Sequence, residues 1–154
     1  MIKAKQPRYF DKVNPCFPIL DAKVFRKQIS EERDKVSPAL LACLYAHTLV
    51  YWKYAEPLCR HHCPNERFVW NLANEAVYSE LHLQPSISII KATLLNVGGR
   101  PTTSLVGNAL LLGAAVSMAN SLGLNRDPTA WDISWSEKRE RMQIWWALLY
   151  HDRW

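Results

Sequence analysis

A short segment near the middle of the chain carries four side chains of the kind that bind metal ions. They are Cys59, His61, His62 and Cys63. Thiolate and imidazole groups are the ligands that zinc prefers, so the segment is a weak candidate metal site. A tetrahedral zinc site usually draws its ligands from two separated pairs, because four neighbouring side chains on one short loop do not readily converge on one ion. We therefore interpret the segment as a surface loop with one partly buried cysteine, and zinc binding stays as the alternative.

No local pattern places a nucleophile beside a base. Ser, Cys, His and Asp are all present, but the sequence has no G-x-S-x-G turn. The stretch GGRPTTSLVG lacks the GK[ST] ending of a phosphate-binding loop. His47 stands alone on the more polar side of a predicted helix, which is typical of a structural or solvated histidine. We expect no catalytic residue, no cofactor in this chain and no enzymatic activity.

Two pairs of neighbouring opposite charges adjoin apolar helical segments. The pairs are Arg126 with Asp127 and Asp152 with Arg153. Ion pairs at such positions specify geometry more than they add stability, so we expect them to hold one helix against another. Ligand binding by these side chains is the alternative.

The elements that must position these groups are helices. The apolar spacing and the polar N-cap residues predict helices over residues 22–29, 38–52, 66–82, 86–97, 103–122 and 134–154. The fold class is therefore all-α, an irregular array of about five to six helices. Residues 1–20 form an extended lead-in, because Pro15 and Pro18 exclude helix there, and residues 21–154 form the helical array.

Two of the predicted helices have a predicted packing role. The 66–82 helix is expected to bury one side, made of Phe68, Leu72, Val77, Tyr78 and Leu81. The 103–122 helix is the most apolar, and small residues such as Gly107 and Gly113 let neighbouring helices approach it closely. We expect it to be the central, well-buried helix.

Tryptophans gather at the end of the chain, where five of the seven lie between Trp131 and Trp154. We interpret them as core residues, with a pocket or a partner surface as the alternative. The last helix becomes IWWALLYHDRW and stops without a glycine, a proline or a polar tail. We therefore expect a domain that is incomplete at its C-terminus, with some large side chains more exposed than their chemistry favours. The residues in question are Ile144, Trp145, Leu148, Leu149 and Trp154.

Composition indicates a single globular domain, or part of one. The 154 residues are 49% hydrophobic and 21% charged, with a net charge of +5 that is scattered along the chain. The densest basic cluster, Lys138, Arg139 and Arg141, is diluted by Glu137 and Glu140 and indicates a solvated helix face rather than a nucleic-acid patch. The sequence has neither an apolar signal core nor an apolar run long enough to span a bilayer. We expect a soluble, intracellular protein whose four cysteines are free thiols.

The sequence resembles the fungal-specific transcription factor domain, the middle homology region of zinc-cluster regulators and the regulatory domain of xylanolytic-activator-type proteins. Four stretches carry the resemblance. They are YFDKVNPCFPIL from Tyr9, SPALLACLYA from Ser37, PSISIIKATLL from Pro85, and GAAVSMANSLGLNRD followed by SEKRERMQIWWALLYHDRW. The positions that match the family motif, expected to be structural, are Gly113, Gly123, Leu124, Arg126, Asp127, Trp145, Trp146, Asp152 and Arg153. Asn125 departs from the histidine that many members have, and Met142 and Gln143 interrupt a run that is often all arginine.

The resemblance implies a regulatory, non-enzymatic module of a nuclear protein that controls transcription, present here as the N-terminal portion of the domain. In this family zinc and DNA are bound by a separate six-cysteine cluster, which four cysteines at these spacings cannot form. The implied partners are the remainder of a transcription factor or other proteins, and a small-molecule effector, with DNA contacted only through a separate domain and no membrane. The alternatives are a stand-alone helical interaction protein that uses its tryptophan-rich final helix, and a small zinc-binding protein.

Overall fold

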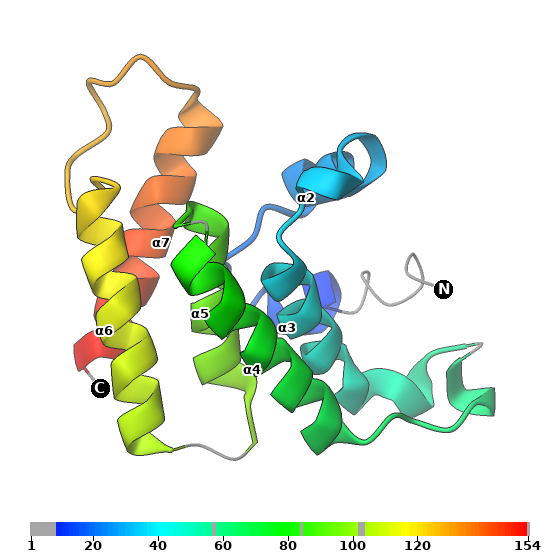
Figure 1. Ribbon diagram of the computed structural model, residues 1–154. Helices are drawn as coiled ribbons and strands as arrows, with labels where there is room; N and C mark the ends of the chain where they lie inside the picture. Colours follow the sequence, from blue (N-terminus) through cyan, green and yellow to red (C-terminus); the bar gives the residue numbers. More distant parts are fainter. Residues whose placement is uncertain (1–8, 57, 84, 102–103, 154) are drawn as a thin grey trace.

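The chain folds into helices packed around one buried helix (Figure 1). The computed structural model describes residues 9–56, 58–83, 85–101 and 104–153, and within these ranges it contains no strand. The α-helices are α2 (Ala22–Glu31), α3 (Pro38–Thr48), α4 (Glu66–Leu83), α5 (Ile87–Gly99), α6 (Leu105–Ser121) and α7 (Trp135–Arg153). Shorter elements are the π-helix η2 (Tyr9–Val13) and the 3-10 helices η3 (Arg33–Lys35), η4 (Leu49–Tyr54) and η5 (Leu58–Arg60). The predicted all-α class is confirmed, and the short π- and 3-10 helices raise the count of described helical segments above the expected five to six.

Every described α-helix begins at a polar side chain that accepts a hydrogen bond from a backbone amide two or three residues further on. These N-cap residues are Asp21, Ser37, Asn65, Ser86, Ser104 and Ser134. Such caps satisfy amides that have no partner inside the helix. Because capping is a local interaction, the helix starts fall within two residues of the positions that the sequence predicts.

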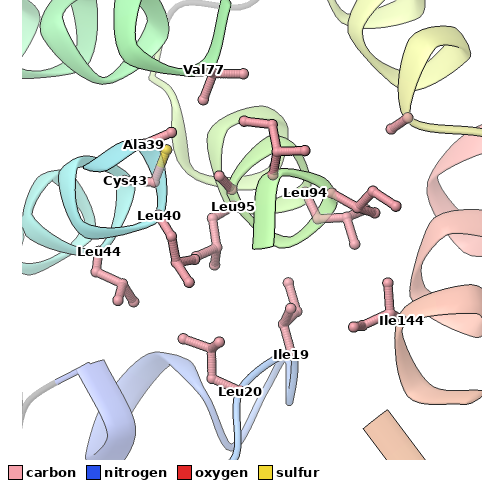
Figure 2. Close-up of a cluster of buried hydrophobic side chains, with 14 of the residues drawn as sticks. Ile19, Leu20, Ala39, Leu40, Cys43, Leu44, Val77, Leu94, Leu95 and Ile144 are labelled. Atoms are coloured by element: carbon pink, nitrogen blue, oxygen red, sulfur yellow. The ribbon is translucent and has the colours of Figure 1, made fainter. Parts of the chain in front are cut away.

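The centre of the fold is α5, in which every residue from Ile89 to Asn96 is buried. α3 and α4 pack on it, and so do α6 and α7. Figure 2 shows side chains from several elements converging on this helix. Those labelled are Ile19, Leu20, Ala39, Leu40, Cys43, Leu44, Val77, Leu94, Leu95 and Ile144.

The expectation that the 103–122 helix is central is wrong. α6 buries one side, with Leu111 and Ala115, and leaves the other open. Val106, Leu110 and Gly113 follow one another at spacings of four and three on the open side, and a Cβ built at Gly113 would meet nothing within 4 Å. An apolar composition does not decide which helix is surrounded. That position belongs to α5 because helices pack on it from several sides.

The buried side of α4 also differs from the prediction. Of the five residues expected there, only Val77 is buried, while Phe68 is 61% exposed. The side that faces α3 carries Trp70, Ala73 and Val77, and it continues to Glu80, whose carboxylate accepts hydrogen bonds from the Ser37 hydroxyl (2.6 Å) and the Ala39 amide (2.7 Å). The carboxylate accepts from the amide end of α3 and so links α4 to α3.

The lead-in is not extended throughout, because residues Tyr9–Val13 form a π-helical turn. The amide of Asn14 closes the turn on the carbonyl of Tyr9 at 2.9 Å. The Asn14 side chain then donates to the carbonyl of Leu20 (3.0 Å) and accepts from its amide (3.3 Å). Pro15 and Pro18 exclude helix only beyond the turn, so the expectation was too broad for the residues before them.

Candidate interaction surface

The connection between α6 and α7 begins with a glycine turn. Gly123 has φ of +70°, a left-handed conformation that glycine adopts without the steric cost of a side chain. The amide of Leu124 reaches back to the carbonyl of Ala119 (2.9 Å), and that of Gly123 to the carbonyl of Asn120 (3.1 Å). This pattern closes the end of a helix. It buries the Leu124 side chain in the core.

Arg141 on α7 secures this connection. Its Nη1 donates to the carbonyl of Leu122 (3.2 Å), and its guanidinium carbon lies 5.1 Å from the ring centroid of Trp131. Oε1 of Glu137, one turn earlier, lies 3.5 Å from Nε of Arg141. The Nζ of Lys138 donates to the carbonyl of Thr129 (2.8 Å). Lys138 and Arg141 therefore bind backbone carbonyls of the α6–α7 connection, whereas we expected a solvated helix face.

The two charge pairs that were expected to join helices do not do so. Arg126, Asp127, Asp152 and Arg153 are all exposed, and none forms an ion pair with another residue in the described ranges. The Oδ1 of Asp127 accepts a hydrogen bond from the amide of Thr129 (2.9 Å), and this bond lowers the pKa of the Asp127 carboxyl. The four side chains are exposed, so water solvates each charge.

The ion pair that does join helices was not predicted. Lys91, in the middle of α5, is only 8% exposed, and its Nζ donates to Oε1 of Glu140 on α7. A buried ammonium needs such a partner, because desolvation of an unpaired charge is costly. The signal in the sequence was a lone lysine inside the apolar run SISIIKATLL. The partner could not be read from the sequence, since it lies 49 residues away.

A groove runs between the lead-in and the outer side of α7. It encloses about 610 Å³. The residues that line it are Cys16, Phe17, Pro18, Ile19, Arg139, Met142, Gln143, Trp146, Ala147 and Tyr150. Trp146 is 69% exposed and Tyr150 is 63% exposed. The groove therefore presents large aromatic surfaces to solvent.

A second hollow, of about 390 Å³, lies between α6 and α7. It is lined by Val97, Leu105, Asn108, Ala109, Leu112, Tyr150, His151 and Asp152. Tyr150 lines both hollows. We call Leu105, Ala109, Trp146 and Tyr150 the α6–α7 face. All four are exposed, Leu105 by 86% of its surface.

The interpretation of the tryptophan cluster as core holds for Trp145, which packs against the core, and is wrong for Trp135 and Trp146. Trp135 and Trp146 are exposed, and Trp131 and Trp145 are only half-buried, while Trp154 lies outside the described ranges. The pocket-lining alternative holds for Trp146, which lies in the groove. The side of α7 that is buried in the core carries Ile144 and Leu148.

The expectation of overexposed residues near the end of α7 is correct in part. Ile144 and Leu148 are fully buried, whereas Trp145 and Leu149 are half-buried. The most exposed large side chains of this segment are Trp146 and Tyr150, which the prediction did not name. Residues 144 and 148 face α5, and residues 146 and 150 lie on the opposite side of the same helix.

The candidate zinc ligands lie on a loop around η5. Cys59, His61 and His62 are exposed, and Cys63 is half-buried against a small cluster formed by Leu49, Trp52, Ala55 and Leu58. The indole of Trp52 donates to the carbonyl of His61 (3.0 Å), which fixes the loop backbone. In the parts of the chain that the structure describes, no three His, Cys, Asp or Glu side chains converge in a way that could hold a metal ion.

Cys43 is buried in the core, and His47 is partly buried beside it. The ring of His47 faces Tyr9 and Trp70, not the polar side that the sequence suggested, and its Nε2 donates to the carbonyl of Leu95 (2.9 Å). Burial lowers the pKa of His47, and it raises the pKa of the Cys43 thiol to about 12. A neutral imidazole and a protonated thiol are structural groups here.

The sequence comparison decides the family of the chain. A model described as the fungal-specific transcription factor domain matches residues 7–154, which include all the described helices. The chain belongs to this family. The resemblance drawn from the four sequence stretches is thereby confirmed.

Two transcriptional regulators contain regions similar to this fungal-specific transcription factor domain. An uncharacterized transcriptional regulatory protein of Schizosaccharomyces pombe is 33% identical over 153 residues, which are 95% of this chain and 22% of that protein. The transcriptional activator protein DAL81 of Saccharomyces cerevisiae is 29% identical over 147 residues, which are 95% of this chain and 15% of DAL81. The chain therefore spans less than a quarter of the length of these relatives. No solved structure matches it significantly.

The family-motif residues of this fungal-specific transcription factor domain have different surroundings. Gly123 and Leu124 build the turn between α6 and α7, and Trp145 packs against the core. Gly113 lies on the open side of α6, and Trp146 lies in the groove.

None of the helices in the described ranges combines the length and apolarity that crossing a bilayer requires.

Proposed function

We propose that this chain is a non-enzymatic regulatory module of a transcriptional regulator that acts in the nucleus. The family match over residues 7–154 supports the regulatory role, and so do relatives named as a transcriptional regulatory protein and a transcriptional activator. The observation that carries the mechanism is the exposed α6–α7 face. It offers a surface for protein contacts, whereas the sequence contains no motif that places a nucleophile beside a base.

The α6–α7 face docks the remainder of a regulator or another protein. Leu105, Trp146 and Tyr150 place large apolar surfaces in water on the side opposite the core. Exposed apolar side chains around two hollows favour an interaction site, because covering them removes apolar area from water. In the relatives the matched region is followed or preceded by much more chain, which provides neighbours for such a face. An effector that changes this docking would shift the regulator between active and inactive states.

DNA is contacted through a separate domain in this proposal. The basic residues Lys138 and Arg141 bind carbonyl oxygens of the neighbouring loop, which reduces the charge available for phosphates. We expect the chain alone to retain duplex DNA only weakly, with a steep loss as salt is added. An electrophoretic mobility assay that shows tight, sequence-specific binding by the chain alone would contradict this part of the proposal.

The chain works without a cofactor of its own in this proposal, and zinc binding is the testable alternative. Metal analysis of dialysed protein measures the bound zinc directly. We expect no stoichiometric zinc. One equivalent of zinc that is lost in a Cys59→Ser variant would assign a metal site to the η5 loop.

Disruption of the gene in its fungal host tests the regulatory role. We expect the levels of a defined set of transcripts to change, and a fluorescently tagged protein to accumulate in the nucleus. Unchanged transcripts, together with a tagged protein that stays outside the nucleus, would contradict the proposal. That outcome would favour the second candidate, a stand-alone interaction protein, which the exposure of Trp146 also supports.

A further inference from the structure

A second apolar stripe on α7 forms the floor of the groove. The α7 residues in it are Arg139, Met142, Gln143, Trp146, Ala147 and Tyr150. Their successive spacings of three, one, three, one and three place them on one side of the helix. The other apolar side, with Ile144 and Leu148, is buried in the core. One side of α7 therefore packs in the core, and the other side faces solvent.

The dimensions of the stripe match a short helix. From Arg139 to Tyr150 it extends about 16 Å, because each helical residue rises about 1.5 Å. This is about three helical turns. An amphipathic partner helix with apolar side chains at every third or fourth position covers such a stripe.

The opposite wall of the groove, Cys16–Ile19, is held in place. The ring of Phe17 lies 4.9 Å from that of His151 on α7. The side chain of Asn14 bonds both backbone groups of Leu20, which ties the two ends of this segment together. A preorganised wall favours binding, because less conformational freedom is lost when a partner enters.

The charge at one end of the groove points to an acidic partner. Arg139 is exposed and forms no hydrogen bond or ion pair with a described residue, whereas Lys138 and Arg141 bind backbone carbonyls. The lining contains no acidic side chain. A carboxylate placed opposite Arg139 would therefore gain an ion pair without displacing one.

We propose that this groove binds an amphipathic helical peptide. Its apolar side chains pack on Met142, Trp146 and Tyr150, and its acidic side chain pairs with Arg139. The inference rests on the proposed function, since it gives part of the α6–α7 face a partner of defined chemistry. The peptide folds as it binds, because isolated helices of about three turns are marginal in water.

Two designed peptides test the charge requirement. Each is a fluorescein-labelled helix of about 14 residues with leucines at every third or fourth position, and carries either glutamates or lysines at one end. Fluorescence anisotropy measures their binding to the full chain. We expect the glutamate peptide to bind about 10-fold more tightly, and Arg139→Glu to reverse the preference. Arg67→Glu, at an exposed arginine outside the groove, should leave the preference intact.

A matched pair of tryptophan variants tests the position of the peptide. Trp146→Ala should weaken binding about 30-fold, as expected for the loss of a central aromatic anchor. Trp135 lies on the same helix and is 62% exposed, but it does not line the groove, so Trp135→Ala should bind like the unaltered chain. Equal losses in the two variants, or equal binding of the two peptides, would overturn the proposal. Circular dichroism checks that each variant is folded.

Sedimentation at the same protein concentrations separates a peptide from a second copy of the chain. A dimer that Trp146→Ala dissociates and that the glutamate peptide does not displace would assign the groove to self-association and overturn the proposal. If the chain binds neither peptide while gene disruption still changes transcripts, the proposed helical peptide in the groove is overturned and the proposed function stands. Charge-selective peptide binding with unchanged transcripts would instead overturn the proposed function alone.

Discussion

Gly99, the last residue of α5, lies directly against the imidazole ring of His47 on α3. A Cβ built at Gly99 would overlap that ring and would lie 2.7 Å from the ring of Trp70. Both rings are held by the surrounding packing, so they cannot move aside cheaply. The close approach of α3, α4 and α5 at this point therefore depends on a residue without a side chain.

Gly99→Ala is expected to destabilise the fold by about 2–3 kcal/mol, the usual cost of overpacking a filled site. Gly113→Ala is the matched control. Its Cβ would meet nothing within 4 Å on the open side of α6, so it should stabilise the fold by up to about 1 kcal/mol through helix propensity. Urea unfolding of both variants measures the difference. Similar stabilities for the two variants would contradict the packing described around His47.

The stability of the fold should fall as the pH drops below the ordinary pKa of histidine. Burial lowers the pKa of His47 from 6.5, and the hydrogen bond to Leu95 opposes this only in part. The unfolded chain therefore binds a proton at a higher pH than the folded one. The contribution is intact above about pH 6.5 and declines below it, by at most about 1.4 kcal/mol per pH unit, until the folded pKa is passed. Denaturation of the protein and of His47→Gln from about pH 5 to pH 7.5 should give a shallower dependence in the variant. Parallel curves would rule out this role of His47.

The Lys91–Glu140 pair predicts asymmetric effects of its two partners. Glu140→Ala leaves a buried ammonium without a counter-ion and should cost about 2–3 kcal/mol. Lys91→Met places an apolar chain of similar length in the same site and leaves a half-exposed carboxylate, so it should cost less than about 1 kcal/mol. The double variant should recover most of the loss of Glu140→Ala. A double-mutant cycle by chemical denaturation measures the coupling, and additive losses would show that the pair is not formed.

Arg141→Lys should destabilise the α6–α7 connection by about 1 kcal/mol. A lysine cannot both donate to the carbonyl of Leu122 and lie flat on the Trp131 ring as the planar guanidinium does. Arg139→Lys, two positions earlier on the same helix, removes no such contact and should stay within about 0.5 kcal/mol of the unaltered protein. Thermal unfolding compares them. Equal midpoints would show that Arg141 contributes nothing beyond its charge.

Local features of this fold were predictable from the sequence. N-cap residues such as Asp21 and Ser134 act on amides within their own helix, so the sequence contains everything that determines them. The turn at Gly123 is of the same kind, because a left-handed residue after an apolar helix requires glycine. The helix boundaries and the all-α class follow from such short-range interactions.

The partners of each helix side were not predictable from the sequence. Phe68 and Trp70 are both large apolar residues of α4, and contacts with α3, such as the packing of Trp70 on His47 and the bond from Ser37 to Glu80, accompany the inward position of Trp70. Trp145 and Trp146 are adjacent, yet one packs on the core and the other lines the groove. Interactions between residues distant in sequence make these choices, and a single sequence does not specify them.

Transcript levels in strains with single substitutions on α7 test the central claim most directly. The claim is that the chain regulates transcription through protein contacts of the α6–α7 face. Trp146→Glu in the genomic copy should reproduce the transcript changes of gene disruption at an unaltered protein level. Trp135→Glu, at an equally large and similarly exposed residue of the same helix, should leave transcripts unchanged. Normal transcripts in the Trp146→Glu strain, or the same changes in both strains, would contradict the claim.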